Sequence, residues 1–368
     1  MSAVTTGPYR VGVVGAGWAA RSIWLPRLLR HPAFEVAAVV DAAPAARAAV
    51  RDHAPGARLL ASTEQLGADV DLAVVAVPNH LHNAVAVDLL RRGVPVFVEK
   101  PVCLNSAEAV ELAHAERSAG AVLLAGSAAR YRSDVGALRE VAAGLGSIRH
   151  IDLSWVRAGG IPDGAGWFTR RQLSGGGALL DLGWHLLDLV EPLLGPVDVT
   201  QAVGMVTDDF INRAASRADW RGDGTGEMSR GDVEDTARGF LVTGDGVSIA
   251  LQASWASHEE RDVTTVRIDG SAGSALLRCT FGFSPNRVEV SSLSVHRDGR
   301  VEPVPVTEEA IGAEYDRQLD DIAVRLTDPA AKGRGVAEAA RAIDVIERLY
   351  ASARHFGASA ASPQVTSR

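Results

Sequence analysis

Lysine is nearly absent from this chain. Its 368 residues contain two lysines, Lys100 and Lys332, against 35 arginines. Lys100 stands in Glu99-Lys100-Pro101, directly after the apolar run of residues 94–98. A lysine ammonium is a compact charge whose pKa falls readily on burial, whereas an arginine stays protonated at any working pH. A lone lysine in a chain that otherwise uses arginine therefore predicts a catalytic or polarising group, with a chance surface lysine as the alternative.

Other scarcities exclude whole classes of protein. The chain has two cysteines, Cys103 and Cys279, which indicate neither a disulfide nor a metal site. So few cysteines are typical of a reducing compartment, and we therefore expect a cytoplasmic protein. No apolar stretch approaches the ~20 residues of a membrane span, and the N-terminus has no signal pattern. The formal net charge of −8 argues against nucleic acid and anionic membranes as partners.

The length and composition predict a globular protein of two domains. A chain of 368 residues exceeds one ordinary core, and 47% hydrophobic with 22% charged residues is typical of globular proteins. We place a nucleotide-binding domain at residues 1–128 and a second α/β domain at 129–368, whose last helix can pack back on the first domain.

The first domain begins with a glycine turn between a strand and a helix. Residues 9–14 are rich in β-formers, residues 21–29 are typical of a helix, and Gly15-Ala16-Gly17-Trp18-Ala19-Ala20 lies between them. The first glycine permits the tight turn, the second lets a pyrophosphate approach the backbone, and the small Ala20 lets the helix pack on the strand. The turn predicts a dinucleotide site.

The second predicted strand, residues 35–40, ends in Asp41. An acid at this point hydrogen-bonds the adenosine ribose and repels a 2′-phosphate, so NAD is favoured over NADP. A turn residue or helix cap is the alternative for Asp41, and we expect Arg47 to lie on a helix face.

Further βα units follow, with predicted strands at residues 70–77, 94–98 and 122–125. Ligands of open α/β sheets bind outside the carboxyl ends of the strands. That rule gathers Gly15, Asp41, Asn79 and Lys100 around one crevice. The Lys100-Pro101 bond is a candidate cis peptide.

The second half carries a polar pair on a predicted helix. Three glycines at 175–177 precede the apolar stretch 178–190, in which Asp181 and His185 are four residues apart and share one face. An acid beside a histidine can orient the imidazole for general-base catalysis. A satisfied core histidine is the alternative.

Six marks now stand in order along nearly the whole chain: the glycine turn, Asp41, the Pro78-Asn79 loop with His82, Glu99-Lys100-Pro101, the glycine run with Asp181 and His185, and Val233-Glu234-Asp235-Thr236. In this order they resemble the Gfo/Idh/MocA oxidoreductases, the glucose–fructose oxidoreductase and inositol dehydrogenase group. The resemblance implies a Rossmann domain followed by an α/β domain with a large, open, mostly antiparallel sheet. It also implies a homodimer or homotetramer built through that sheet.

The resemblance implies a catalytic set of Lys100, Asp181 and His185 at the nicotinamide. His185 would be the acid/base, Lys100 would polarise the reacting oxygen, and Asp181 would position His185 or the substrate. The expected cofactor-binding residues are Gly15, Gly17, Trp18, Ala19, Ala20, Asp41, Val77, Pro78, Asn79, His82, Glu99 and Lys100. The candidate substrate-binding residues are Arg130, Arg157, Trp167 and Asp181, with Arg132 a further candidate. Core packing is the alternative for Trp167, and a surface charge is the alternative for Arg130 and Arg132.

The rest of the second half predicts a sheet closed by helices. Residues 247–255, 263–269, 273–279 and 288–296 are typical of strands, and 308–326 and 336–353 of helices. The polar insert 207–232 is either a substrate lid or merely a mobile loop.

We therefore expect an NAD-dependent dehydrogenase that oxidises a secondary hydroxyl of a sugar, cyclitol or amino-sugar ring. The alternatives are an NAD(P)H-dependent keto-sugar or imine reductase in secondary metabolism, and a non-catalytic NAD-binding regulator or assembly protein. Acids in loops suggest a cationic substrate such as an aminoglycoside; they are Asp163, Asp208, Asp209 and Glu227.

Overall fold

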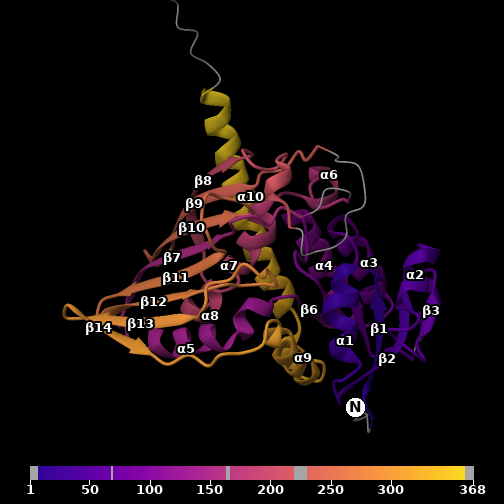
Figure 1. The fold of residues 1–368 in the computed structure, drawn as a ribbon. Helices are drawn as coiled ribbons and strands as arrows, with labels where there is room; N and C mark the ends of the chain where they lie inside the picture. Colours follow the sequence, from indigo (N-terminus) through magenta and orange to yellow (C-terminus); the bar gives the residue numbers. More distant parts are fainter. Residues whose placement is uncertain (1–6, 68, 163–165, 219–229, 361–368) are drawn as a thin grey trace, which may run out of the picture. The chain divides into compact units, whose positions relative to one another are not determined.

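The computed structural model describes residues 7–67, 69–162, 166–218 and 230–360, which fold as two compact units (Figure 1). Unit 1 comprises Met1–Tyr131, Gln172–Gly175 and Ala310–Ala340, and unit 2 comprises Arg132–Arg171, Gly176–Glu309 and Arg341–Arg368. Two segments that we expected in the second domain, 172–175 and 310–340, thus belong to unit 1.

Unit 1 is built on one parallel sheet whose strand order is β3-β2-β1-β4-β5-β6. The predicted strands are confirmed; β3 was missed because its three residues carry no pattern. The strands are β1 (Tyr9–Val14), β2 (Phe34–Val40), β3 (Arg58–Leu60), β4 (Leu72–Val75), β5 (Val96–Val98) and β6 (Leu123–Ala125). The sequences of these strands are nearly continuous apolar runs because a parallel sheet is covered on both faces.

The helices of unit 1 begin with a π-helical turn directly after the glycine loop, η1 (Ala20–Trp24), which continues as α1 (Leu25–Leu28). The others are α2 (Pro44–Val50), α3 (Asn79–Arg91), α4 (Ser106–Ala119) and α9 (Ala313–Arg325). Trp24 explains why α9 joins this unit. The Trp24 indole packs edge-on against Phe97 of β5 and Tyr315 of α9, with ring centroids 4.7 Å and 5.6 Å apart.

Unit 2 contains an eight-stranded sheet of order β14-β13-β12-β11-β7-β10-β9-β8. Neighbours are antiparallel except β7 and β10, which are parallel, so the predicted mostly antiparallel sheet is confirmed. The strands are β7 (Ile148–Val156), β8 (Val199–Thr207), β9 (Thr236–Thr243), β10 (Ser248–Ser254), β11 (Val263–Gly270), β12 (Gly273–Cys279), β13 (Ser292–Arg297) and β14 (Arg300–Val304).

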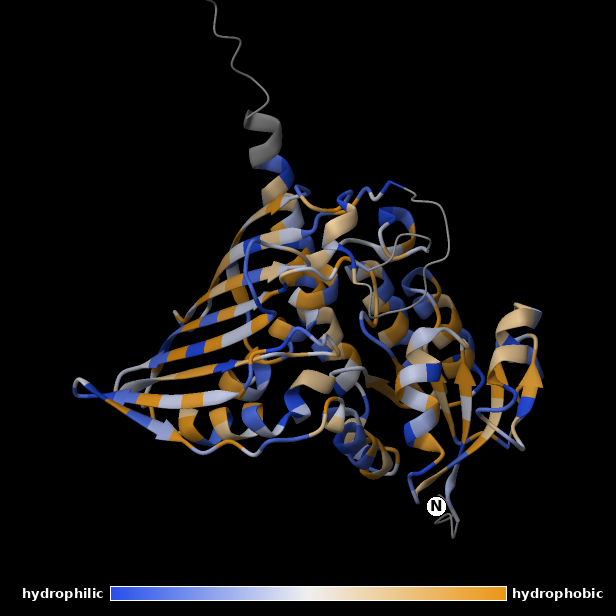
Figure 2. Cartoon of the chain, viewed as in Figure 1, coloured by the Kyte–Doolittle hydropathy of each residue, from blue (hydrophilic) through white to orange (hydrophobic). Residues whose placement is uncertain are grey.

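The two faces of this sheet differ in polarity, as the alternating colours of its strands show (Figure 2). Along β7, Ile151, Leu153 and Trp155 are buried, while the residues between them are half-buried. Helices cover the apolar face, with α5 packing on β12 and α7 on β7. The helices of unit 2 are α5 (Ser133–Ala142), α7 (Trp184–Leu187), α8 (Val190–Leu194) and the later part of α10 (Arg334–Ala360), whereas α6 (Arg171–Ser174) lies mostly in unit 1.

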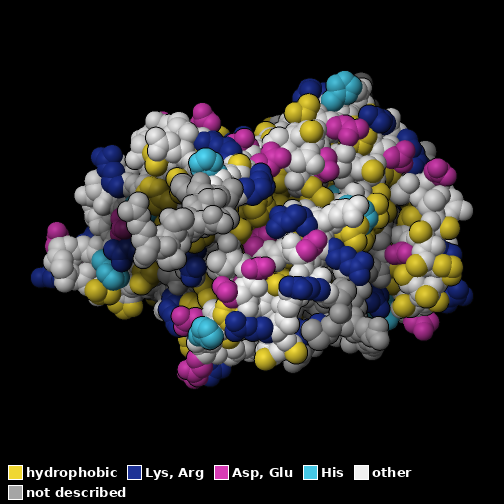
Figure 3. All heavy atoms as spheres, turned by 90° about the horizontal axis from the view of Figure 1, so that it is seen from above, with side chains coloured by type: hydrophobic (Ala, Val, Ile, Leu, Met, Phe, Trp, Pro, Cys, Tyr) yellow, Lys and Arg dark blue, Asp and Glu magenta, His cyan; other side chains and the backbone are white. Residues whose placement is uncertain are grey.

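The surface carries charges of both signs. On the face that Figure 3 shows, basic and acidic side chains are interspersed rather than gathered in one large patch.

None of the helices in the described ranges combines the length and apolar composition that a membrane span requires.

A buried ion pair ties the start of α10 to unit 1. Arg130 donates to the Glu338 carboxylate at 2.9 Å, and their side chains are 10% and 5% exposed. Burial raises the pKa of Glu338, but the cations of Arg130 and Arg334 outweigh burial and hold this pKa below its usual value.

We expect Arg130→Met to lower the free energy of unfolding by about 3 kcal/mol at pH 7, because it leaves a buried carboxylate without its main partner. A carboxyl whose folded pKa is depressed stabilises above its unfolded pKa, so the penalty should shrink as the pH falls below about 4. Guanidinium denaturation at several pH values measures both effects. Arg91→Met is the control, since the Arg91–Glu111 pair is 61% and 46% exposed; equal losses in both variants would contradict the prediction.

Candidate active site

The glycine loop of unit 1 has the shape that a dinucleotide needs. Gly15 has a φ of +97°, and a Cβ there would lie 2.5 Å from the Ala76 carbonyl oxygen, so only glycine fits. Nothing lies within 4 Å of the corresponding position at Gly17, which leaves the backbone open to a pyrophosphate. Ala20 is fully buried. These residues fit the NAD(P) cofactor that the loop predicts.

Asp41 follows β2 and faces the glycine loop. One of its carboxylate oxygens accepts the Ala16 amide at 2.9 Å, and the other accepts the Ala43 amide at 2.8 Å. Arg47 lies at the end of α2, where its guanidinium donates to the backbone carbonyls of Asp41 and Ala42. The carboxylate is thus held beside the loop that would carry the pyrophosphate.

His82 joins the ends of two neighbouring strands of unit 1. Its Nδ1 lies 2.7 Å from the Pro101 carbonyl, and its Nε2 lies 2.9 Å from the Val77 carbonyl. Burial lowers the pKa of His82, although both carbonyls oppose that shift. The ring therefore clamps the loop after β4 to the loop after β5. Asn79, at the first turn of α3, donates to the Ser174 carbonyl at 2.9 Å within the same unit.

The backbone at Lys100 is held by the side chain of Glu99. One Glu99 oxygen accepts the Trp24 indole N–H at 2.7 Å, and the other accepts the Lys100 amide at 2.9 Å. The Lys100-Pro101 peptide is cis, as the sequence suggested. Gly126 lies against this turn, because a Cβ there would come within 2.8 Å of the Lys100 nitrogen. Lys100 itself is half-buried at the carboxyl end of β5.

In unit 2, Asp181 and His185 lie on one helical segment. The expected continuous helix 178–190 is instead a π-helical turn, η4 (Leu179–Gly183), followed by α7 and, after a break, by α8, which contains Pro192. Short π segments recur at functional sites. Asp181 and His185 are 8% and 7% exposed. The indole N–H of Trp255, the residue directly after β10, donates to Asp181 Oδ2 at 2.8 Å.

An aromatic layer lies against His185. The centroid of the Trp155 ring on β7 lies 5.7 Å from the centroid of the imidazole and 5.4 Å from that of the Phe281 ring. Two buried arginines stack on this layer, with Arg157 5.1 Å from Trp155 and Arg132 4.8 Å from Phe281. The imidazole thus packs against Trp155, which Phe281 and Arg157 contact in turn.

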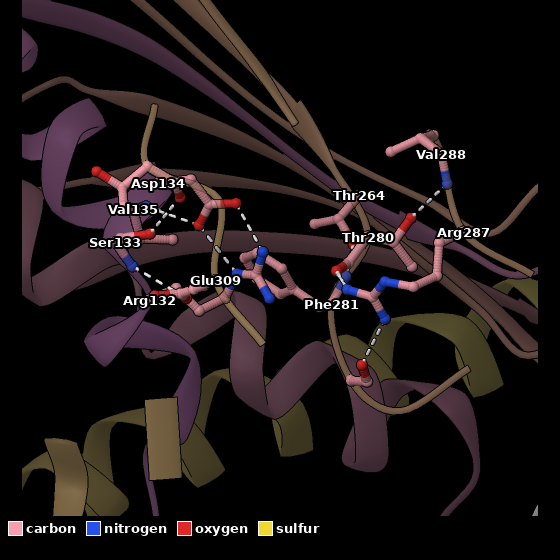
Figure 4. A network of polar contacts seen from close by, with 12 residues as sticks. Arg132, Ser133, Asp134, Val135, Thr264, Thr280, Phe281, Arg287, Val288 and Glu309 are labelled. Atoms are coloured by element: carbon pink, nitrogen blue, oxygen red, sulfur yellow. Dashed lines mark hydrogen bonds and ion pairs between the residues drawn. The ribbon is translucent and has the colours of Figure 1, made fainter. Parts of the chain in front are cut away.

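Arg132 belongs to a polar network at the edge of this layer (Figure 4). Its guanidinium makes a two-pronged contact with the Asp134 carboxylate at 2.9 and 2.6 Å. On the other side of Phe281, Arg287 donates to the Thr280 carbonyl. The network holds the segment that carries Phe281, whose ring packs edge-on against Trp155.

The remaining predicted substrate residues are divided between the units. Arg157, Trp167 and Asp181 lie in unit 2. The centroid of the Trp167 ring is 4.6 Å from that of Phe168, and the Phe168 ring in turn lies 6.0 Å from that of Trp255. Arg130 lies in unit 1, where it pairs with Glu338. Lys100 also belongs to unit 1, whereas His185 belongs to unit 2.

Part of the polar insert lies outside the described residues, as do Asp163 and Glu227. Its described part includes Asp208 and Asp209, and the Phe210 amide donates to Asp235 at 2.6 Å. In the described ranges, no group of three or more His, Cys, Asp or Glu side chains is arranged to hold a metal ion.

Two contacts of the site escaped the sequence analysis. Trp255 and Trp24 hold Asp181 and Glu99, yet each lies more than 70 residues away from its partner in the chain. A tryptophan ending a strand or inside a helical turn is usually a core residue. No local signal marked either one, because the partner becomes visible only when the chain is folded.

Family models match both halves of the chain. Residues 9–127 match an oxidoreductase family with an NAD-binding Rossmann fold, and residues 138–276 match the GFO/IDH/MocA C-terminal domain. A putative UDP-kanosamine synthase oxidoreductase subunit of Amycolatopsis mediterranei is 58% identical, over 94% of this chain and 96% of that protein. A D-glucoside 3-dehydrogenase of Escherichia coli is 27% identical, over 79% of this chain and 83% of that protein.

Solved structures share the fold at low identity. GenD2 from gentamicin A biosynthesis, in complex with NAD, has a TM-score of 0.74 at 22% identity and covers 96% of both chains. KijD10, a 3-ketoreductase from Actinomadura kijaniata in complex with NADP and TDP-benzene, has a TM-score of 0.74 at 20% identity, covering 94% of this chain and 98% of that chain.

The glycine loop, the strand order of unit 1 and the open sheet of unit 2 thus agree with both family models and with a relative of more than half identical residues. This chain belongs to the Gfo/Idh/MocA family of oxidoreductases, with an NAD(P)-binding Rossmann domain.

Proposed function

We propose that this enzyme is an NAD-dependent dehydrogenase that oxidises a ring hydroxyl of a nucleotide-linked hexose. The observation that carries the proposal is that Asp181 and His185 are both buried on one helical segment, four residues apart, with Asp181 held by Trp255. A buried histidine that packs against an aromatic ring and has a carboxylate four residues away on the same segment is suited to take a hydroxyl proton.

The residues divide the proton and charge work between them. His185 removes the proton of the substrate hydroxyl while the C–H bond of the same carbon breaks, so that a ketone forms. NAD, when bound, supplies the acceptor for the hydride that leaves this carbon. Lys100 stabilises the negative charge that develops on the oxygen, and its ammonium is more effective in a site shielded from water. Asp181 positions the imidazole or the substrate.

The relatives support position 3 of a hexose as the oxidised carbon. Kanosamine is glucose with an amino group in place of its 3-hydroxyl, and a ketone at C3 is the intermediate that amination needs. The 58% identical relative is named for UDP-kanosamine synthesis, and the glucoside dehydrogenase and KijD10 are also named for position 3. UDP-glucose is therefore the first substrate to try.

The reverse reaction, reduction of a keto-sugar, is the second candidate, and the name of KijD10 supports it. Asp41 favours the oxidative direction, because pathways that reduce generally use NADPH and a carboxylate at this position repels its 2′-phosphate.

We expect His185→Ala to lower kcat by about 10²–10⁴-fold and Lys100→Met by about 10²–10³-fold, since each removes an interaction made in the transition state. NADH formation measures this, with UDP-glucose, glucose, inositols and amino sugars as substrates. Lys332→Met is the matched control, because Lys332 is the other lysine and is exposed. Near-normal kcat in either site variant would remove that residue from its role.

The panel also separates the candidate reactions. Turnover of carbonyl substrates with NADH or NADPH, without any oxidation of the hydroxyl compounds, would establish the reductase instead. Amino sugars whose KM does not change with salt would exclude recognition through acidic loops.

For the cofactor, we expect a clear preference for NAD⁺ over NADP⁺ that depends on Asp41. Replacing Asp41 with Ala should raise the KM for NAD⁺ about tenfold, because charge-assisted hydrogen bonds to the ribose are lost. The same change should raise relative activity with NADP⁺. Equal use of both cofactors by the unaltered enzyme would contradict this assignment.

We also propose that the open face of the unit 2 sheet joins copies of the chain. Across its strands the register aligns Arg278, Thr265, Ser154, Gln252 and Arg238 in one row. Next to this row, β8 and β9 expose three apolar side chains: Val203 at 53%, Met205 at 61% and Phe240 at 48%. Exposed apolar groups beside a polar row are typical of an interface.

Met205→Asp should therefore convert a homo-oligomer into a smaller species in light scattering coupled to size exclusion. Val110→Asp is the control, because Val110 is 68% exposed on α4 of unit 1. A monomeric unaltered enzyme would exclude the interface.

A further inference from the structure

We propose that Glu234 and Tyr350 are positioning residues that anchor the helical segment bearing Asp181 and His185. The expected effect on catalysis rests on the proposed function, whereas the anchoring itself does not. The anchoring concerns residues of unit 2 alone, and it links α10 to the segment.

Glu234 caps the start of the segment. It is 2% exposed and lies just before β9. Its Oε1 accepts the amides of Gly177 at 2.9 Å and Leu179 at 3.2 Å, and its backbone carbonyl accepts the Ala178 amide at 3.1 Å. Three consecutive amides at the beginning of a helix are thus satisfied by one residue. These are the amides that a helix leaves without internal partners.

Tyr350 of α10 completes the anchor. Its hydroxyl donates to Glu234 Oε1 at 2.6 Å, and Arg171 donates to Glu234 Oε2 at 3.3 Å. The Arg171 guanidinium also lies 5.5 Å from the Tyr350 ring. Burial raises the pKa of the Glu234 carboxyl, and these donors oppose the shift. Burial and the neighbouring carboxylate also raise the pKa of the Tyr350 phenol, which keeps its proton to donate.

The glycine run follows from this anchor. A Cβ at Gly176 would lie 2.1 Å from the Tyr350 hydroxyl, and one at Gly177 would lie 1.8 Å from the Glu234 carbonyl oxygen. Neither position can accept a side chain while Tyr350 and Glu234 stay in place. The two glycines thus let the segment start directly on the buried carboxylate.

The anchor sets the position of the proposed catalytic pair. Asp181 lies one turn after the capped amides, and its own amide donates to the Gly177 carbonyl at 3.0 Å. His185 follows one turn later. A shift at the start of so short a segment moves both side chains, and displacements of about 1 Å can lower a rate by about 10²-fold.

The test compares hydrogen exchange and kinetics in Glu234→Gln and Tyr350→Phe. Glu116→Gln is the matched control, because Glu116 is also 2% exposed and accepts two amides, those of Leu123 and Gly333, in unit 1. We expect amides of residues 177–187 to exchange about tenfold faster in both anchor variants and unchanged in the control. Tyr350→Phe keeps the test decisive if Glu234→Gln does not fold.

The kinetic arm uses UDP-glucose with and without deuterium at C3. We expect kcat to fall about 10- to 10²-fold with little change in KM, and the deuterium isotope effect on kcat to increase as hydride transfer becomes limiting. A loss of folded protein alone would lower kcat without changing the isotope effect.

Unchanged exchange in both variants would overturn the anchor, and so would faster exchange with unchanged kcat and isotope effect. Failure of the proposed function looks different, because the unaltered enzyme would then form no NADH from UDP-glucose. The exchange measurement needs no substrate and decides the anchor in that case.

Discussion

A buried carboxylate that accepts backbone amides is the interaction on which each unit depends. Glu99 holds the Lys100 amide and the Trp24 indole in unit 1, and Glu234 holds the amides of Gly177 and Leu179 in unit 2. A buried charge costs several kcal/mol unless it is fully hydrogen-bonded, so the chain around each carboxylate has little freedom to move. The same interaction that stabilises the fold therefore places the residues to which we assign chemistry.

Aromatic packing extends this constraint through each core. In unit 1, Trp24 connects Glu99 to Phe97 of the sheet and to Tyr315 of the late helix α9. In unit 2, Trp255 connects Asp181 to Phe168. An indole can do both because it buries a large apolar surface and keeps one N–H donor at its edge. Segments far apart in the chain are thereby held against the same polar groups.

Much of the nucleotide-binding unit could be predicted because its signals are local. Gly15, Gly17 and Asp41 stand at fixed points of a strand–turn–helix–strand pattern, and the six marks along the chain were sufficient for the family, which the comparisons confirm. The continuous helix predicted at 178–190 was wrong in detail. Apolar periodicity does not distinguish an α-helix from a π turn followed by a break, because both bury the same side chains.

By itself, the sequence determined the fold class of both units and the dinucleotide loop, and it supplied the residues that we propose for proton transfer, because glycine, lysine, aspartate and histidine are restricted by their own chemistry. Only the tertiary structure decided how these residues are held. The pairing of Asp181 with Trp255, of Glu99 with Trp24 and of Glu234 with Tyr350 spans 74, 75 and 116 residues. Contacts at such separation follow from how strands and helices pack, and no local pattern in the chain encodes them.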